Sequence, residues 1–169
     1  MTSRTLVIMR HAKAEQSGPS DVERLLAESG QADAAAAGAW LAERGITPDA
    51  ALVSAAVRTE MTWEALAERA GWDVEATLDE GLYDAGPESA LDLVRAADPA
   101  VSTLLVVGHN PTMSILAQLL DDGEGDVGAS TEMTQGFPTC ALAVLVLEGP
   151  WAELDEASAV VTAFHVSRA

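Results

Sequence analysis

The stretch Leu6-Val7-Ile8-Met9-Arg10-His11-Ala12 joins an apolar run directly to an arginine, a histidine and a small residue. An unbroken apolar run is typical of a strand that is buried on both faces of a parallel sheet. Open α/β sheets bind ligands at the carboxyl ends of such strands, which is where Arg10 and His11 fall. Taken alone, the pair is equally compatible with a basic turn that follows a strand.

A second apolar run, Ser102-Thr103-Leu104-Leu105-Val106-Val107-Gly108, also ends in a histidine, His109. Asn110 and Pro111 come next and predict a helix to Leu120, with Asn110 as its N-cap and Pro111 in its first turn. Two of the three histidines in the chain therefore follow its two clearest strands. This placement favours a shared ligand site over a chance arrangement.

The remaining apolar patterns predict alternating strands and helices. We expect strands at 50–54, 73–78, 139–147 and 159–166, and helices from Ala27 to about Arg44, at 56–70 and at 87–97. Gly45 and Gly71 suit the left-handed position after the first two helices. Residues 14–21 and 79–84 are expected to be loops, and the acidic, glycine-rich residues 121–136 a mobile loop.

This alternation predicts one domain over residues 1–169, an α/β fold. We expect a three-layer α/β/α sandwich whose central sheet is mostly parallel, with an antiparallel edge formed by the last strands. A chain of 169 residues is long enough to bury a core, and its 49% hydrophobic content suits a compact protein.

The net charge of −18 argues against nucleic acids and anionic membranes as partners. No apolar run approaches the roughly 20 residues of a membrane helix. The single cysteine, Cys140, excludes an internal disulfide, and a cytoplasmic location is expected. With only nine basic residues, the position of each one matters.

Arg58 is placed in the first turn of a predicted helix, where a cation opposes the helix dipole. A bound anion nearby would offset that opposition, which makes Arg58 a candidate ligand residue. A surface ion pair is the alternative explanation.

Arg10-His11-Ala12, Ser54 with Arg58, and Gly108-His109-Asn110 together resemble the signature of the histidine phosphatase superfamily. The resemblance is closest to its SixA-like branch, the phosphohistidine phosphatases, and spans nearly the whole chain. The further residues that carry it are Lys13, Ala14, Asp21, Arg24, Leu26, Pro111, Phe137, Pro138, Thr139 and Trp151.

The resemblance implies that His11 is a nucleophile that becomes phosphorylated and is then regenerated by water. Arg10, Arg58 and His109 would bind the phosphoryl group, since guanidinium groups donate in pairs to phosphate oxygens. Glu80 is the nominated proton donor, and a solvated loop carboxylate is its alternative interpretation. No metal or other cofactor is implied.

The expected substrate is phosphohistidine of a protein, for example a histidine-containing phosphocarrier domain. A phosphatase of small phosphomonoesters and a non-catalytic phospho-ligand binder are the alternatives. Ser54 is expected to shape its turn, and Cys140 and His165 to be structural.

Overall fold

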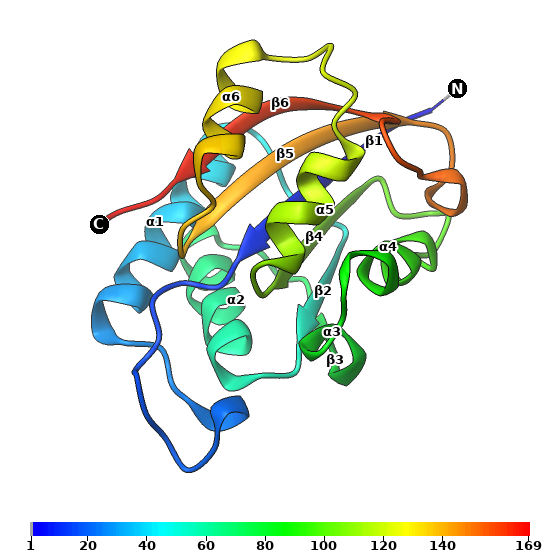
Figure 1. The fold of residues 1–169 in the computed structure, drawn as a ribbon. Coiled ribbons are helices and arrows are strands. Elements are labelled where there is room, and N and C mark those ends of the chain that lie inside the picture. Colours follow the sequence, from blue (N-terminus) through cyan, green and yellow to red (C-terminus); the bar gives the residue numbers. More distant parts are fainter. Residues whose placement is uncertain (1) are drawn as a thin grey trace.

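The computed structural model describes residues 2–169. Its centre is a six-stranded sheet in the order β3-β2-β4-β1-β5-β6 (Figure 1). The strands are β1 (Ser3–Arg10), β2 (Ala50–Ser54), β3 (Ala76–Asp79), β4 (Thr103–Gly108), β5 (Ala141–Glu148) and β6 (Ala159–Val166). The first four are parallel, whereas β5 is antiparallel to both β1 and β6.

Helices cover both faces of this sheet. The helices are α1 (Glu28–Glu43), α2 (Val57–Ala70), α3 (Glu80–Tyr83), α4 (Pro87–Arg95), α5 (Thr112–Leu120) and α6 (Val127–Gln135). Short 3-10 turns lie at Asp21–Glu23 and Trp151–Glu153. The predicted three-layer α/β fold with an antiparallel edge is therefore confirmed.

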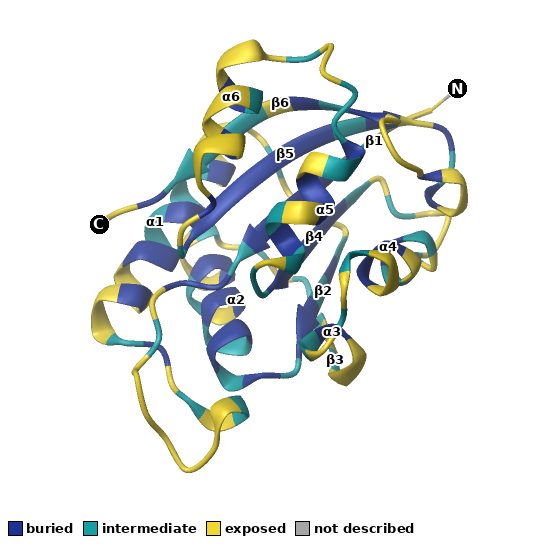
Figure 2. Ribbon diagram, viewed as in Figure 1, coloured by how far each residue is buried: buried dark blue, intermediate teal, exposed yellow. Residues whose placement is uncertain are grey.

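The central strand β1 contributes to two separate cores. Leu6 and Ile8 pack on the side covered by α4, α5 and α6, while Val7 and Met9 pack on the side of α1 and α2. All four side chains are fully buried, and the strands of the sheet interior are dark in Figure 2. Alternate residues of a strand face opposite sides of its sheet, so an unbroken apolar run is what a doubly covered strand requires.

The two predicted glycine terminators are confirmed, because Gly45 and Gly71 have φ of 70° and 75°. Helix α1 starts after Ala27, which offers no side-chain cap. Helix α5 begins one residue later than predicted: Pro111 is its N-cap, and the Asn110 side chain accepts a hydrogen bond from the Ser114 amide at 3.3 Å.

The prediction of a mobile loop at 121–136 is wrong, because α6 occupies Val127–Gln135. The Asp126 carboxylate caps this helix by accepting from the Ala129 amide at 2.8 Å, and Ala129 and Met133 are buried one turn apart. Residues 79–84 also hold a short helix, α3, which the Asp79 side chain caps, and β3 starts at Ala76 rather than at residue 73.

No helix within residues 2–169 has the length and apolar character needed to cross a membrane.

Candidate active site

Three parallel strands bring the predicted site residues to one edge of the sheet. Strands β2, β4 and β1 are neighbours, and Arg10 pairs with Gly108 in the ladder. The His11 amide donates to the Gly108 carbonyl at 3.1 Å, which continues the ladder beyond both strands. The histidine rings that follow β1 and β4 are consequently 5.4 Å apart between centroids.

The imidazole of His11 is held in one tautomer. Its Nδ1 lies 2.7 Å from the Ala12 carbonyl oxygen, and a carbonyl only accepts, so Nδ1 carries the proton. Nε2 is left with its lone pair free. Burial is the main cause that lowers the pKa of His11 to about 4; the charges of Arg58 and Arg10 act in the same direction, and the Ala12 bond opposes them. The ring is therefore neutral at pH 7.

Arg58 is the hub of the site, with a side chain only 6% exposed. Its Nη1 donates to the Asp21 carbonyl at 2.8 Å, and its Nη2 contacts the Asp21 carboxylate at 3.1 Å. Nη2 also lies 3.4 Å from Nδ1 of His109. Arg58 thus forms an ion pair with the exposed Asp21, as the alternative explanation expected, but its own side chain is buried.

The tautomer of His109 follows from its two neighbours. Because Arg58 can only donate, Nδ1 of His109 accepts. Nε2 therefore carries the ring proton and donates it in a hydrogen bond to the Ser54 hydroxyl at 2.7 Å. Burial, followed by the nearby His11 and Arg58, lowers the pKa of His109 to about 3. Ser54 thus orients the His109 ring, besides contacting the Ala56 amide in its turn.

Two guanidinium nitrogens in this site have no hydrogen-bond partner. Among the described residues, Nε of Arg10 and Nε of Arg58 are buried donors without an acceptor; Nε of Arg4 and Oγ of Ser167, both outside the site, share that state. An unsatisfied buried donor costs about 1–3 kcal/mol, and more when it is charged. A bound oxyanion would supply acceptors to both, beside the free nitrogen of His11.

Backbone groups and one threonine fix the parts of the site. The Phe137 carbonyl accepts from Arg10 Nη1 at 3.2 Å and from the Asn110 side chain at 2.7 Å. The Thr62 hydroxyl donates to the Arg58 carbonyl and accepts from the Ala12 amide. These contacts link β1, α2 and the segment before β5 around one position.

The described residues contain no group of three or more His, Cys, Asp or Glu side chains that could hold a metal ion.

Comparison with known proteins shows the family of the chain. Residues 6–88 match the sequence profile of the histidine phosphatase superfamily (branch 1). An uncharacterised Mycobacterium tuberculosis protein, Rv1276c, is 38% identical over 162 residues, covering 95% of this chain and all of the relative. The chain belongs to the histidine phosphatase superfamily.

Solved structures place it in the SixA-like branch of that superfamily. The "putative phosphohistidine phosphatase SixA" of Nakamurella multipartitia is 34% identical, with a TM-score of 0.86 over 100% of this chain and 99% of the other. The corresponding protein of Agrobacterium tumefaciens is 34% identical, with a TM-score of 0.75 over 85% and 92%. A mycobacterial glucosyl-3-phosphoglycerate phosphatase, at 18% identity and a TM-score of 0.62, shares the fold alone.

In this histidine phosphatase Glu80, the predicted proton donor, lies at the exposed start of α3. Within residues 2–169, Glu80 forms no hydrogen bond or ion pair with Arg10, His11, Arg58 or His109. Tyr83, from the same short helix, does reach the site: its ring meets the His109 ring edge-on, with centroids 5.4 Å apart.

Asp21 and Tyr83 border the phosphatase site, and neither was predicted to do so from its residue type. The Tyr83 hydroxyl donates to the Asp21 carboxylate, which also binds Arg58 and Arg24. The Tyr83 bond, together with the Arg58 and Arg24 contacts, lowers the pKa of Asp21 to about 2. The only signal for Asp21 was its place in the pattern shared with the SixA-like branch.

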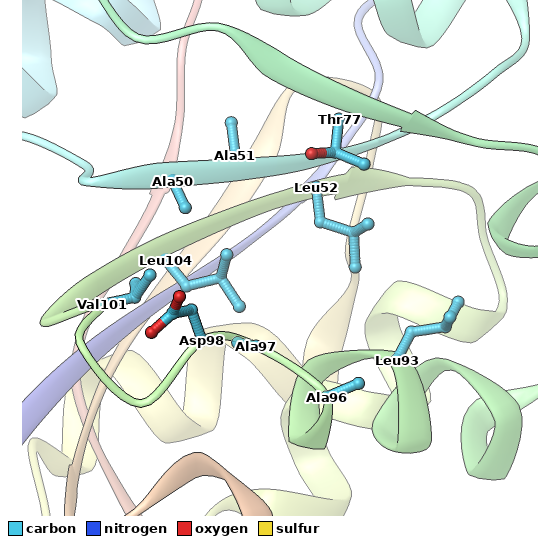
Figure 3. Close-up of a pocket in the computed structure, with 10 residues that line it drawn as sticks. All are labelled: Ala50, Ala51, Leu52, Thr77, Leu93, Ala96, Ala97, Asp98, Val101 and Leu104. Carbon is cyan, nitrogen blue, oxygen red and sulfur yellow. The ribbon is translucent and has the colours of Figure 1, made fainter.

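A separate cavity of about 280 Å³ lies towards the amino ends of β2 and β4, beneath α4 (Figure 3). Its lining is mostly apolar, including Leu52, Leu93 and Leu104, and contains none of the site residues. It is a packing gap between the sheet and α4, remote from the phosphatase chemistry.

Proposed function

We propose that this phosphatase removes the phosphoryl group from phosphohistidine of a protein, through a covalent phosphohistidine formed on His11. The observation that carries the proposal is the state of His11: its ring is neutral, with Nδ1 bonded to Ala12 and Nε2 free, and the two nearby guanidiniums have buried, unpaired Nε–H groups. A neutral nitrogen lone pair beside an anion-binding cradle is what in-line attack on phosphorus requires.

In the first step Nε2 of His11 forms a bond to phosphorus while the bond to the leaving group breaks. Arg10 and Arg58 stabilise the negative charge on the equatorial oxygens through their free Nε–H groups. Nδ1 of His109 lies 3.4 Å from Arg58. A phosphate dianion bound at Arg58 would raise the pKa of His109, and the protonated ring would then donate a hydrogen bond to the phosphate as well. Water then attacks the phosphohistidine, and the Ala12 carbonyl keeps the proton on Nδ1 throughout.

A protein substrate suits the surroundings of the site. The connection between β3 and α4 is only residues 80–86, with α3 as its one helix, so no large insertion covers His11 from that side. The two structures described above at 34% identity carry the SixA name. A small phosphomonoester is the second candidate, favoured by the shared fold of the glucosyl-3-phosphoglycerate phosphatase. For such an oxygen leaving group, Glu80 stays our nominated proton donor.

The test is a substrate panel with a matched inactive variant. Wild-type protein should dephosphorylate a phosphohistidine-containing protein faster than sugar phosphates, and His11→Ala should abolish both activities. A phosphodonor should label wild-type protein with an acid-labile, base-stable phosphate that the variant lacks. An unlabelled, inactive wild type that still binds phosphate would instead identify a non-catalytic phospho-ligand binder.

A further inference from the structure

We propose that Asp21 holds the ring proton of the leaving imidazole, on the nitrogen remote from phosphorus, and so makes the site selective for P–N bonds. This inference rests on the proposed phosphohistidine activity and names the residue that would favour that substrate.

A phosphohistidine ring cannot accept a proton on its phosphorylated nitrogen, because that nitrogen has no free lone pair. Its departure from phosphorus would give an imidazolate anion, a poor leaving group, unless the other ring nitrogen already carries a proton. With that proton present, the P–N bond breaks, its electron pair stays on the leaving nitrogen, and a neutral imidazole departs. The proton comes from solvent with the substrate ring and never moves during transfer.

The enzyme side of the reaction already has this arrangement. His11 attacks through Nε2 while its remote nitrogen, Nδ1, stays protonated on the Ala12 carbonyl. After transfer His11 is the cationic phosphorylated ring and the substrate is the neutral one, so charge and protons balance. The substrate ring needs an equivalent acceptor for its remote N–H, and a carboxylate stabilises a cationic ring better than a carbonyl does.

Asp21 is the carboxylate that the structure attaches to the phosphate-binding residues. Its Oδ2 lies 3.1 Å from Nη2 of Arg58, the same nitrogen that lies 3.4 Å from His109. Its negative charge acts on the His109 ring, where it raises the pKa against the stronger effect of burial. Glu80, the other candidate, has no such contact.

The Asp21 carboxylate is also open to a further donor. Its side chain is 55% exposed, and the Oδ1 atom has a single side-chain donor, Nε of Arg24 at 3.0 Å. A carboxylate oxygen accepts two hydrogen bonds, so one position on Oδ1 is free for a ring N–H. Tyr83 and Arg58 fix the opposite oxygen and thereby the direction in which the free position faces.

The same residue is unsuited to an oxygen leaving group. An alkoxide must be protonated on the scissile oxygen, which requires a carboxylic acid rather than a carboxylate. Hydrogen bonds from Tyr83, Arg58 and Arg24 keep Asp21 ionised at neutral pH. The ionised Asp21 carboxylate therefore stabilises the cationic leaving ring but cannot protonate a leaving alkoxide.

The experiment compares two substrates in Asp21→Asn and in a matched control. Asparagine keeps the shape and one acceptor but removes the charge. We expect kcat/KM for a phosphohistidine peptide to fall about 10- to 100-fold, as for the loss of a hydrogen bond to a charged group. For p-nitrophenyl phosphate, whose leaving group departs without a proton, the fall should be less than about 3-fold.

The control is Asp84→Asn, which makes the same change at an exposed carboxylate just after α3 that contacts none of the site residues. It should change neither substrate by more than about 3-fold, and Asp21→Glu should recover part of the lost phosphohistidine activity. In wild type the alkaline loss of kcat for phosphohistidine should occur about one pH unit higher than in Asp21→Asn, because the carboxylate stabilises the protonated ring.

Equal losses on both substrates would show that Asp21 only orients Arg58, and would overturn the proposal. Unchanged or raised phosphohistidine activity in Asp21→Asn would also overturn it, since Asp21 would then be absent from the transition state or compete with phosphate for Arg58. If the wild type neither hydrolyses phosphohistidine nor becomes labelled on His11, the proposed function itself is refuted, whatever the variant does.

Discussion

Replacing His11 by asparagine should remove a pH-dependent loss of stability that the wild type carries. Burial lowers the pKa of His11 from 6.5 in the unfolded chain to about 4 in the folded protein. The unfolded chain therefore binds more protons between these pH values, and the free energy of unfolding falls as the pH falls through this window. The contribution is fully present above pH 6.5 and is lost towards pH 4.

The size of the effect follows from the two pKa values. At 1.36 kcal/mol per pKa unit, the full shift corresponds to about 3 kcal/mol, and about 2 kcal/mol of it is lost between pH 7 and pH 5. Asparagine has no titrating ring and can still donate to the Ala12 carbonyl. Its free energy of unfolding should therefore decrease by about 2 kcal/mol less than that of the wild type over this interval.

Urea unfolding of both proteins at pH 7 and pH 5, with the slope checked for constancy, measures this difference. The carboxylates and His109 are present in both proteins, so their contributions largely cancel in the comparison. If the two proteins lose the same free energy of unfolding between these pH values, the folded state does not hold His11 neutral, and the reasoning for a free Nε2 is wrong.

Two further changes test the rest of the site. Arg58→Ala should raise KM and lower kcat together. The expected fall in kcat/KM is about 10²- to 10³-fold, as for removal of a charge-stabilising donor. Arg69→Ala, in the last turn of α2, is the control and should leave steady-state kinetics unchanged. Gly30→Ala would place a Cβ atom 2.1 Å from the Lys13 carbonyl oxygen, so α1 must shift away from the segment that follows His11. We expect a loss of about 1–3 kcal/mol in urea unfolding together with a lower kcat, and a fully active, equally stable variant would contradict this close approach.

Much of the fold could be predicted because its signals are local. The apolar runs of β1 and β4, and the glycines after α1 and α2, can each be recognised from a few consecutive residues. Helix α6 was missed because only Ala129 and Met133 of its nine residues are buried, which leaves little apolar periodicity to detect. Its one local signal, Asp126 as N-cap, was outweighed by the surrounding glycines and acidic residues.

The ends of parallel strands also indicated which residues would meet. Arg10, His11 and His109 follow neighbouring strands, so their proximity follows from the sheet order. The contact of Asp21 with Tyr83 joins a 3-10 turn to the short helix α3, 62 positions along the chain, and no periodic pattern encodes such a pairing. The Phe137 carbonyl that holds Arg10 is a backbone group and has no signature in residue types.

The position of β1 in the sheet has a consequence for how the chain is made. Leu6 pairs with Leu104 on one side and with Leu145 on the other, so β1 is synthesised 98 and 139 residues before its two neighbours. At about 5–20 residues per second, the second interval lasts about 7–28 s. During that time an apolar strand with two open edges is exposed to other chains, so the segment that ends in the nucleophile is also the one most in need of protection by a chaperone during synthesis.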